Sequence, residues 1–89
     1  MVSRVLVIEP YPDLREAIML TLRREHFSCD AVAAVADAEV QIGRHDYSCV
    51  VVDGDTMREV VATLDPATHV IALPKPFGRD ELLLGVRRP

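Results

Sequence analysis

The chain of 89 residues contains no tryptophan, and only 4% of its residues are aromatic. Aromatic side chains form the platforms on which unpaired bases stack, and basic faces contact nucleic-acid phosphates. This chain has few aromatic residues. It also has no excess of basic residues, because its 10 Lys and Arg are outnumbered by 14 Asp and Glu and its formal net charge is −4. The composition therefore argues against direct binding of nucleic acid.

Long apolar segments are also absent. No stretch approaches the roughly 20 apolar residues that a membrane-spanning helix needs. The apolar run near the N-terminus, "MVSRVLVIEP", is too short for the core of a signal peptide and is ended by Glu9 and Pro10. We therefore expect a soluble, cytoplasmic protein that does not associate with membranes.

Cysteine and histidine are few and scattered. Cys29 and Cys49 have no CxxC spacing and no cluster of metal ligands around them, which predicts buried free thiols. His26, His45 and His69 form no i, i+4 pair, so neither a histidine metal site nor a phosphorylated histidine is indicated.

The residues that are present have a globular balance, with 49% hydrophobic and 27% charged. A chain of this length predicts a single domain, here residues 1–89, that buries about two-thirds of its unfolded surface. No internal repeat or low-complexity tract divides it.

Short apolar runs alternate with segments of helical spacing along the chain. The first helix has a predicted capping box, with Asp13 as its N-cap and Glu16 three residues later. The resulting order, βαβαβαβα, predicts a parallel sheet with helices on both faces. The predicted strands are 4–9, 28–35, 47–53 and 69–73, and the predicted helices are 12–27, 37–46, 57–64 and 78–88.

Charged residues gather where the predicted strands end. In a doubly wound sheet, ligands bind outside the carboxyl ends of the strands. Glu9 and Asp53 close two strands, Asp55 follows two residues after Asp53, and Lys75 lies in the "LPKP" turn after the last strand. Carboxylate oxygens of this kind suit a hard cation such as Mg²⁺.

Four stretches, "RVLVIEPYPDLREAI", "DYSCVVVD", "DPATHVIAL" and "KPF", resemble the response-regulator receiver domains of two-component signalling. The resemblance implies a flavodoxin-like, doubly wound sheet of strand order 2-1-3-4. It also implies that Asp53 is the phosphoacceptor, that Lys75 contacts the phosphoryl group, and that Glu9 is the first of two acids that hold Mg²⁺. The chain is shorter than a receiver, which suggests about four strands and the loss of the fourth helix and the fifth strand.

Two prolines depart from the family pattern. Pro10 stands where the second acid, the main Mg²⁺ ligand, belongs, and Pro74 stands where a Thr or Ser normally couples phosphorylation to movement. Glu9, Asp53 and Asp55 remain the candidate metal ligands, with Mg²⁺ binding expected to be weak or absent.

The last predicted helix contains Leu82, Leu83 and Leu84, which is more apolar surface than one helix face needs. These leucines either pack in the core or contact a partner, and we predict them as interface candidates. The region vacated by the missing elements is predicted to support homodimerisation.

The sequence thus predicts an atypical, non-enzymatic receiver-like module of bacterial signalling. It would act by protein–protein interaction with a histidine kinase or a downstream regulator, independently of phosphorylation. The alternative is a single-domain response regulator that accepts a phosphoryl group on Asp53 with Mg²⁺. A third class, a small enzyme or nucleotide-binding domain, has no GxGxxG or GxxxxGK[ST] motif to support it.

Overall fold

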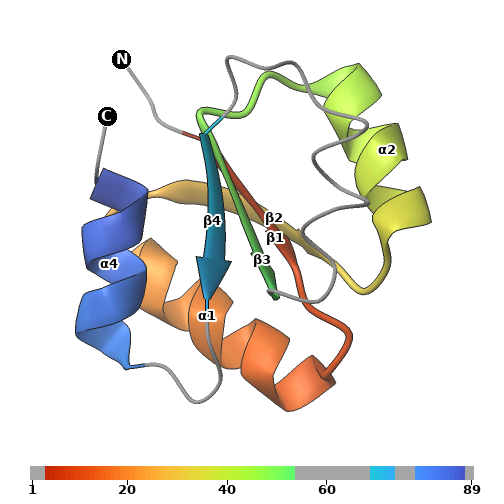
Figure 1. The fold of residues 1–89 in the computed structure, drawn as a ribbon. Helices are drawn as coiled ribbons and strands as arrows, with labels where there is room; N and C mark the ends of the chain where they lie inside the picture. Colours follow the sequence, from red (N-terminus) through yellow and green to blue (C-terminus); the bar gives the residue numbers. More distant parts are fainter. Residues whose placement is uncertain (1–3, 54–68, 74–77, 88–89) are drawn as a thin grey trace.

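The computed structural model describes residues 4–53, 69–73 and 78–87. They form one parallel four-stranded sheet of order β2-β1-β3-β4, as predicted, with helices on both faces (Figure 1). The predicted helix 57–64 lies outside the described residues. The strands are β1 (Arg4–Ile8), β2 (Ser28–Val32), β3 (Cys49–Asp53) and β4 (His69–Leu73), and the helices are α1 (Pro12–Arg24), α2 (Val35–Arg44) and α4 (Arg79–Arg87).

The central strand β1 is buried on both faces, which is why its apolar run is continuous. Val5, Leu6 and Val7 are all 0% exposed. Because successive side chains of a strand point to opposite faces, Val5 and Val7 join one core cluster while Leu6 and Ile8 join another. α1 and α4 cover the first cluster, and α2 covers the second (Figure 1).

The start of α1 differs from the predicted capping box. The N-cap is Tyr11, no side chain caps the helix, and Pro12 is its first residue. Proline is well suited to that position, because its fixed φ matches the helix and its missing N–H would have had no partner there. The prediction of Asp13 as N-cap is therefore wrong. Asp13 lies within the first turn, where a negative charge suits the helix dipole.

The end of α1 is set by His26, whose φ of 66° lies in the left-handed region. The His26 N–H donates to the Arg23 carbonyl at 3.0 Å, and the Phe27 N–H donates to the Leu22 carbonyl at 3.0 Å. This pair of bonds is a Schellman motif, and Phe27 also packs against the core cluster that contains Leu22. The helix therefore ends at Arg24, and not at residue 27 as predicted.

The β2–α2 junction also lies earlier than the sequence suggested. β2 ends at Val32, whereas the predicted strand ended at residue 35. α2 begins at Val35, whereas the predicted helix began at residue 37. Ala34 has an extended backbone, and the helix starts directly after it. Alanine is a strong helix former, which helps the segment after Ala34 to continue as helix.

The sheet register explains why the two cysteines stay reduced. Val5 pairs with Cys29 on one side and with Cys49 on the other. Two strand spacings separate the cysteines by about 10 Å, more than the ~7 Å limit between Cα atoms of a disulfide. Both are free thiols and Cys49 is buried, while Cys29 is only partly buried. Burial raises the pKa of both thiols, that of Cys49 to about 12.

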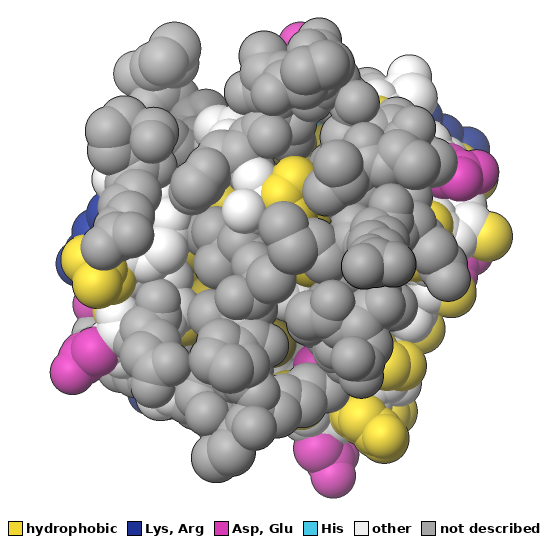
Figure 2. Space-filling model, in the orientation of Figure 1, with side chains coloured by type: hydrophobic (Ala, Val, Ile, Leu, Met, Phe, Trp, Pro, Cys, Tyr) yellow, Lys and Arg dark blue, Asp and Glu magenta, His cyan; other side chains and the backbone are white. Residues whose placement is uncertain are grey.

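α4 packs beside α1 and resolves the ambiguity of the three leucines. Leu82 and Leu83 are buried in the core with α1, whereas Leu84 is 58% exposed. Apolar atoms accordingly reach the surface over α4, at the left of Figure 2. Of the three interface candidates, Leu82 and Leu83 serve the core of this chain, and Leu84 alone faces outward. Within the described ranges, none of the helices is long and apolar enough to cross a membrane.

Candidate site at the carboxyl edge of the sheet

The sheet register brings the predicted acidic residues to one edge. Ile8 pairs with Val52, so that Glu9 and Asp53 come next along two neighbouring strands. Asp53 closes β3, where its backbone pairs with Leu73 of β4. The carboxyl ends of the neighbouring parallel strands β1, β3 and β4 therefore lie at this one edge, as the sequence predicted.

The remaining predicted site residues cannot be placed in the same way. Asp55 and Lys75 lie outside the described residues, and the Asp53 side chain is not among the described side chains. The roles predicted for these three residues stay predictions.

Glu9 is a buried charged residue, with an exposed fraction of 3%. Its N–H donates to the Val32 carbonyl at 3.0 Å, which extends the β1–β2 ladder by one bond. One carboxylate oxygen accepts a hydrogen bond from the Tyr11 N–H at 3.2 Å, and the Glu9 carbonyl accepts one from the Arg15 guanidinium at 3.0 Å. Glu9 thus holds the turn that leads into α1.

The described residues at this edge do not by themselves make a magnesium site. Mg²⁺ demands near-octahedral oxygen coordination, usually with one or two carboxylates and several waters. Glu9 contributes one carboxylate, already bonded to a backbone N–H, and the exposed Pro10 beside it has no side-chain oxygen. Among the described residues, no three His, Cys, Asp or Glu side chains gather where they could hold a metal ion.

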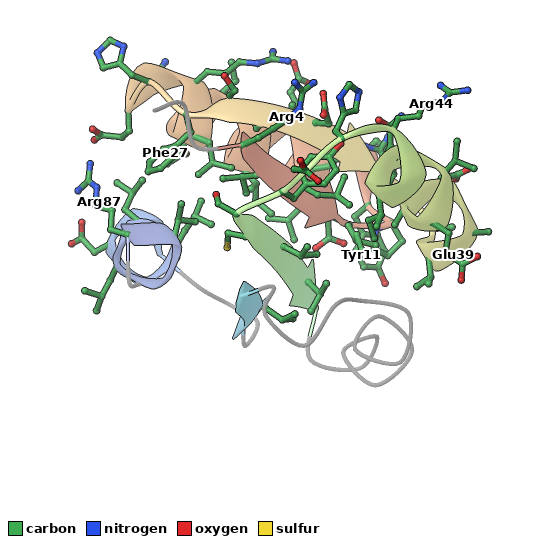
Figure 3. The ribbon with its side chains drawn as sticks, turned by 90° about the horizontal axis from the view of Figure 1, so that it is seen from above. Arg4, Tyr11, Phe27, Glu39, Arg44 and Arg87 are labelled. Atoms are coloured by element: carbon green, nitrogen blue, oxygen red, sulfur yellow. The ribbon has the colours of Figure 1, made fainter. Side chains whose placement is uncertain are left out.

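The turn after Glu9 instead presents apolar surface. Pro10 and Pro12 are exposed, and Tyr11 between them is 63% exposed. Figure 3 shows Tyr11 at this end of the sheet, on the side of α2. Sequence reasoning treated Pro10 as a lost ligand but did not identify the exposed tyrosine that follows it.

A separate polar cluster joins Arg4, Asp30 and Tyr47 at the amino end of β1, away from the candidate site. Asp30 Oδ2 accepts hydrogen bonds from Arg4 Nε at 2.9 Å and from the Tyr47 hydroxyl at 2.7 Å. The Arg4 guanidinium also lies 6.0 Å from the centre of the Tyr47 ring. The bond from Arg4 lowers the pKa of Asp30, while burial, followed by the bond to Asp30, raises the pKa of Tyr47 to about 12.

Sequence reasoning missed this cluster because its members are far apart in the chain. Asp30 is 26 residues from Arg4 and 17 from Tyr47. No local spacing links them, and only the pairing of β1 with β2 and β3 brings them together.

Comparison with known proteins agrees with this fold. The chain is 32% identical over 112 residues to the transcriptional regulatory protein CutR of Streptomyces coelicolor, and equally to CutR of Streptomyces lividans. The similarity covers 94% of this chain and 52% of each relative, so the chain spans about half the length of the curated relatives it matches. No family model matches the chain.

Solved structures also share this fold, at lower sequence identity. The chemotaxis protein CheY4 of Vibrio cholerae has a TM-score of 0.75 at 14% identity, with 98% of both chains covered. A sensor protein from Polaromonas sp. JS666 has a TM-score of 0.67 at 21% identity, covering 94% of this chain and 92% of that one.

The fold and the comparisons together define the class. The chain is a receiver-like domain with the parallel, doubly wound fold of response-regulator receivers. The alignment with CutR runs over 112 positions, more than the 89 residues of this chain, so the relatives have residues there that this chain lacks. This difference agrees with a reduced receiver whose sheet has four strands in the described residues.

Proposed function

We propose that this chain is a regulatory module of bacterial signalling in the cytoplasm that acts by contact with other proteins and does not need phosphorylation. It would have no catalytic activity of its own. Its partners would be a histidine kinase or a downstream regulator, together with a second copy of the chain.

The observation that carries this proposal is the arrangement of Glu9 and Pro10. A receiver that accepts phosphate uses two acids at the end of its first strand, and here the second position is an exposed proline. The remaining acid is buried, and its carboxylate is bonded to the Tyr11 N–H. The position of the second acid is thus taken by a proline in a turn that exposes apolar surface, and such a surface suits protein contact better than metal binding.

The alternative is a phosphorylatable response regulator, favoured by the position of Asp53 at the end of β3, beside the position of Glu9. A carboxylate oxygen of Asp53 would attack the phosphorus of a donor, and the donor's leaving group would depart with its electron pair. Glu9 and Asp55 would hold Mg²⁺, which neutralises charge on the phosphoryl oxygens, and Lys75 would contact those oxygens.

Intact mass after incubation with acetyl phosphate, with and without Mg²⁺, separates the two functions. We expect no phosphoryl adduct on the folded protein in either condition. A Mg²⁺-dependent adduct that is lost in Asp53→Ala, and retained in the control Asp46→Ala at an exposed loop position, would establish the alternative.

A further inference from the structure

Within the described residues, the two edges of the sheet belong to β2 and β4, which each pair with one neighbour. β2 pairs with β1, and β4 pairs with β3 along its whole length, His69–Leu73. An edge strand bonds a neighbour on one side only, so every second N–H and C=O of its backbone faces away from the sheet. Figure 3 shows β4 as the outermost described element at its end of the sheet, and none of the described helices lies beyond it.

The two edge strands differ in the residue at their centre. β2 is SCDAV, and its central residue, Asp30, carries a partly exposed carboxylate. β4 is HVIAL, its central residue is Ile71, and the strand has no Asp, Glu, Lys, Arg or Pro. Natural proteins protect edge strands with charges, prolines or bulges, because an unprotected edge is a template for another strand. The β2 edge thus has a protecting charge that the β4 edge lacks.

An open edge is not in itself evidence of a partner, since every open sheet has two. The composition of β4, however, is that of an inner strand. Its continuous apolar run is like those of β1 and β3, which each have a neighbour on both sides. The resemblance to receivers implies a fifth strand, and the described residues contain none. β4 therefore has the sequence of a strand with two neighbours but, in the part of the chain that the structure describes, only one.

We infer that the β4 edge is where two copies of the chain pair, strand against strand, so that their two sheets join into one. A two-fold axis perpendicular to the sheet passes through the middle of the contact. It makes the two β4 strands antiparallel and sets Ile71 opposite Ile71 of the second copy. The hydrogen bonds of the contact run between the backbone groups of the two strands that face away from β3.

A second copy fits this edge because antiparallel pairing is symmetrical. Each strand offers the other the same donors and acceptors, as a two-fold interface requires. The same arrangement at the β2 edge sets Asp30 opposite Asp30 of the second copy, and like charges directly opposite each other are destabilising. Five residues at about 3.4 Å each give a β4 contact only about 17 Å long, which is short for a stable interface. We therefore expect a dimer that dissociates on dilution.

This inference rests on the homodimer in the proposed function and assigns its contact to β4. Sedimentation over a dilution series tests it with one lysine substitution on each edge strand. Val70 of β4 and Val32 of β2 are both partly buried and pack against the same core cluster. Val70→Lys sets two lysines diagonally across the axis on one face of the joined sheet, and should weaken dimerisation at least tenfold. Val32→Lys is the matched control and should leave dimerisation unchanged.

Hydrogen exchange followed by NMR tests the parent protein without any substitution, so the test holds even where a lysine unfolds the chain. The β4 amides that face away from β3 should exchange several-fold more slowly in concentrated than in dilute protein, because pairing gives them acceptors. The β2 amides that face away from β1 are the internal control and should exchange equally at both concentrations.

The outcomes separate this inference from the proposed function. A parent that dimerises while its β4 amides exchange equally at both concentrations overturns the β4 contact and leaves the proposed homodimer intact. Undiminished dimerisation of Val70→Lys, with circular dichroism showing that the variant is folded, does the same. A parent that is monomeric at every concentration overturns both and leaves the β4 edge to a strand of a different protein. The phosphoryl-transfer result stands independently.

Discussion

Arg4 Nε lies 2.9 Å from Asp30 Oδ2, a contact that ties the first residue of β1 to the middle of β2. The same carboxylate oxygen accepts the Tyr47 hydroxyl, and Tyr47 lies just before β3. One carboxylate therefore fixes the position of three neighbouring segments at the amino end of the sheet.

Acid should destabilise the protein partly through Asp30. The hydrogen bond from Arg4 lowers the pKa of Asp30 below its ordinary value of 3.8. A carboxyl group with a lowered folded-state pKa contributes stability above its unfolded pKa, and this contribution is lost as the pH falls through the folded pKa. Asp30→Asn should therefore lower the melting temperature at pH 7, and the difference from the parent should shrink as the pH falls below about 4. Thermal unfolding followed by circular dichroism measures this, and a difference that does not change with pH would contradict it.

Alkali should act through Tyr47. Its pKa is raised to about 12 from 10.0, mainly by burial and then by the bond to Asp30. Because the folded-state pKa is the higher one, the contribution to stability is complete below pH 10 and is lost between pH 10 and about 12. The chain has two tyrosines, so phenolate absorbance in a Tyr11→Phe background reports Tyr47 alone. Titration near 10 in the folded protein would contradict this, and adding Asp30→Asn should lower the pKa of Tyr47.

Glycine at position 26 should stabilise the protein. His26 has a φ of 66°, a conformation that costs a non-glycine residue about 1–2 kcal/mol, and glycine removes this cost. The greater freedom of glycine in the unfolded chain offsets part of the gain, so His26→Gly should add about 0.5–1 kcal/mol to the free energy of unfolding in urea. His45→Gly is the control, since His45 has a φ of −140° and glycine there relieves nothing. Equal effects of the two substitutions would rule out the backbone explanation.

Two leucines on opposite faces of α4 should respond very differently to truncation. Leu82 is 1% exposed, and Leu82→Ala should cost about 2–5 kcal/mol of unfolding free energy through lost burial and a cavity. Leu84 is 58% exposed, and Leu84→Ala should change the stability of the dilute protein by less than about 0.5 kcal/mol. Denaturant unfolding at low concentration compares them, and similar losses would show that α4 does not pack as described.

The fold could be predicted because its strongest signals are local. The apolar runs of β1 and β3 have no polar alternation, which indicated strands buried on both faces, and their order along the chain fixed the topology. The ends of α1 were harder to predict. A proline at the first position outweighed the capping pattern of Asp13, and the left-handed turn was made by His26, where glycine is the usual signal.

The candidate site was predictable only in part. The strand order brings Glu9 and the end of β3 to one edge, and this much follows from topology. That Glu9 is buried and bonded to the Tyr11 N–H follows from the conformation of a single turn, which spacing does not encode. The cluster around Asp30 depends on contacts between distant residues and has no local signature at all.

The position of β1 has a consequence for how the protein emerges from the ribosome. β1 lies between β2 and β3, and β3 begins at Cys49, past the middle of the 89-residue chain. The buried strand β1 is therefore made before β3 and keeps one unpaired edge until β3 follows. A nascent chain that stops before Cys49 leaves a strand of Val and Leu open on one side, where it can bind a chaperone or another chain. Both edges of β1 should therefore be paired only after β3 has been made.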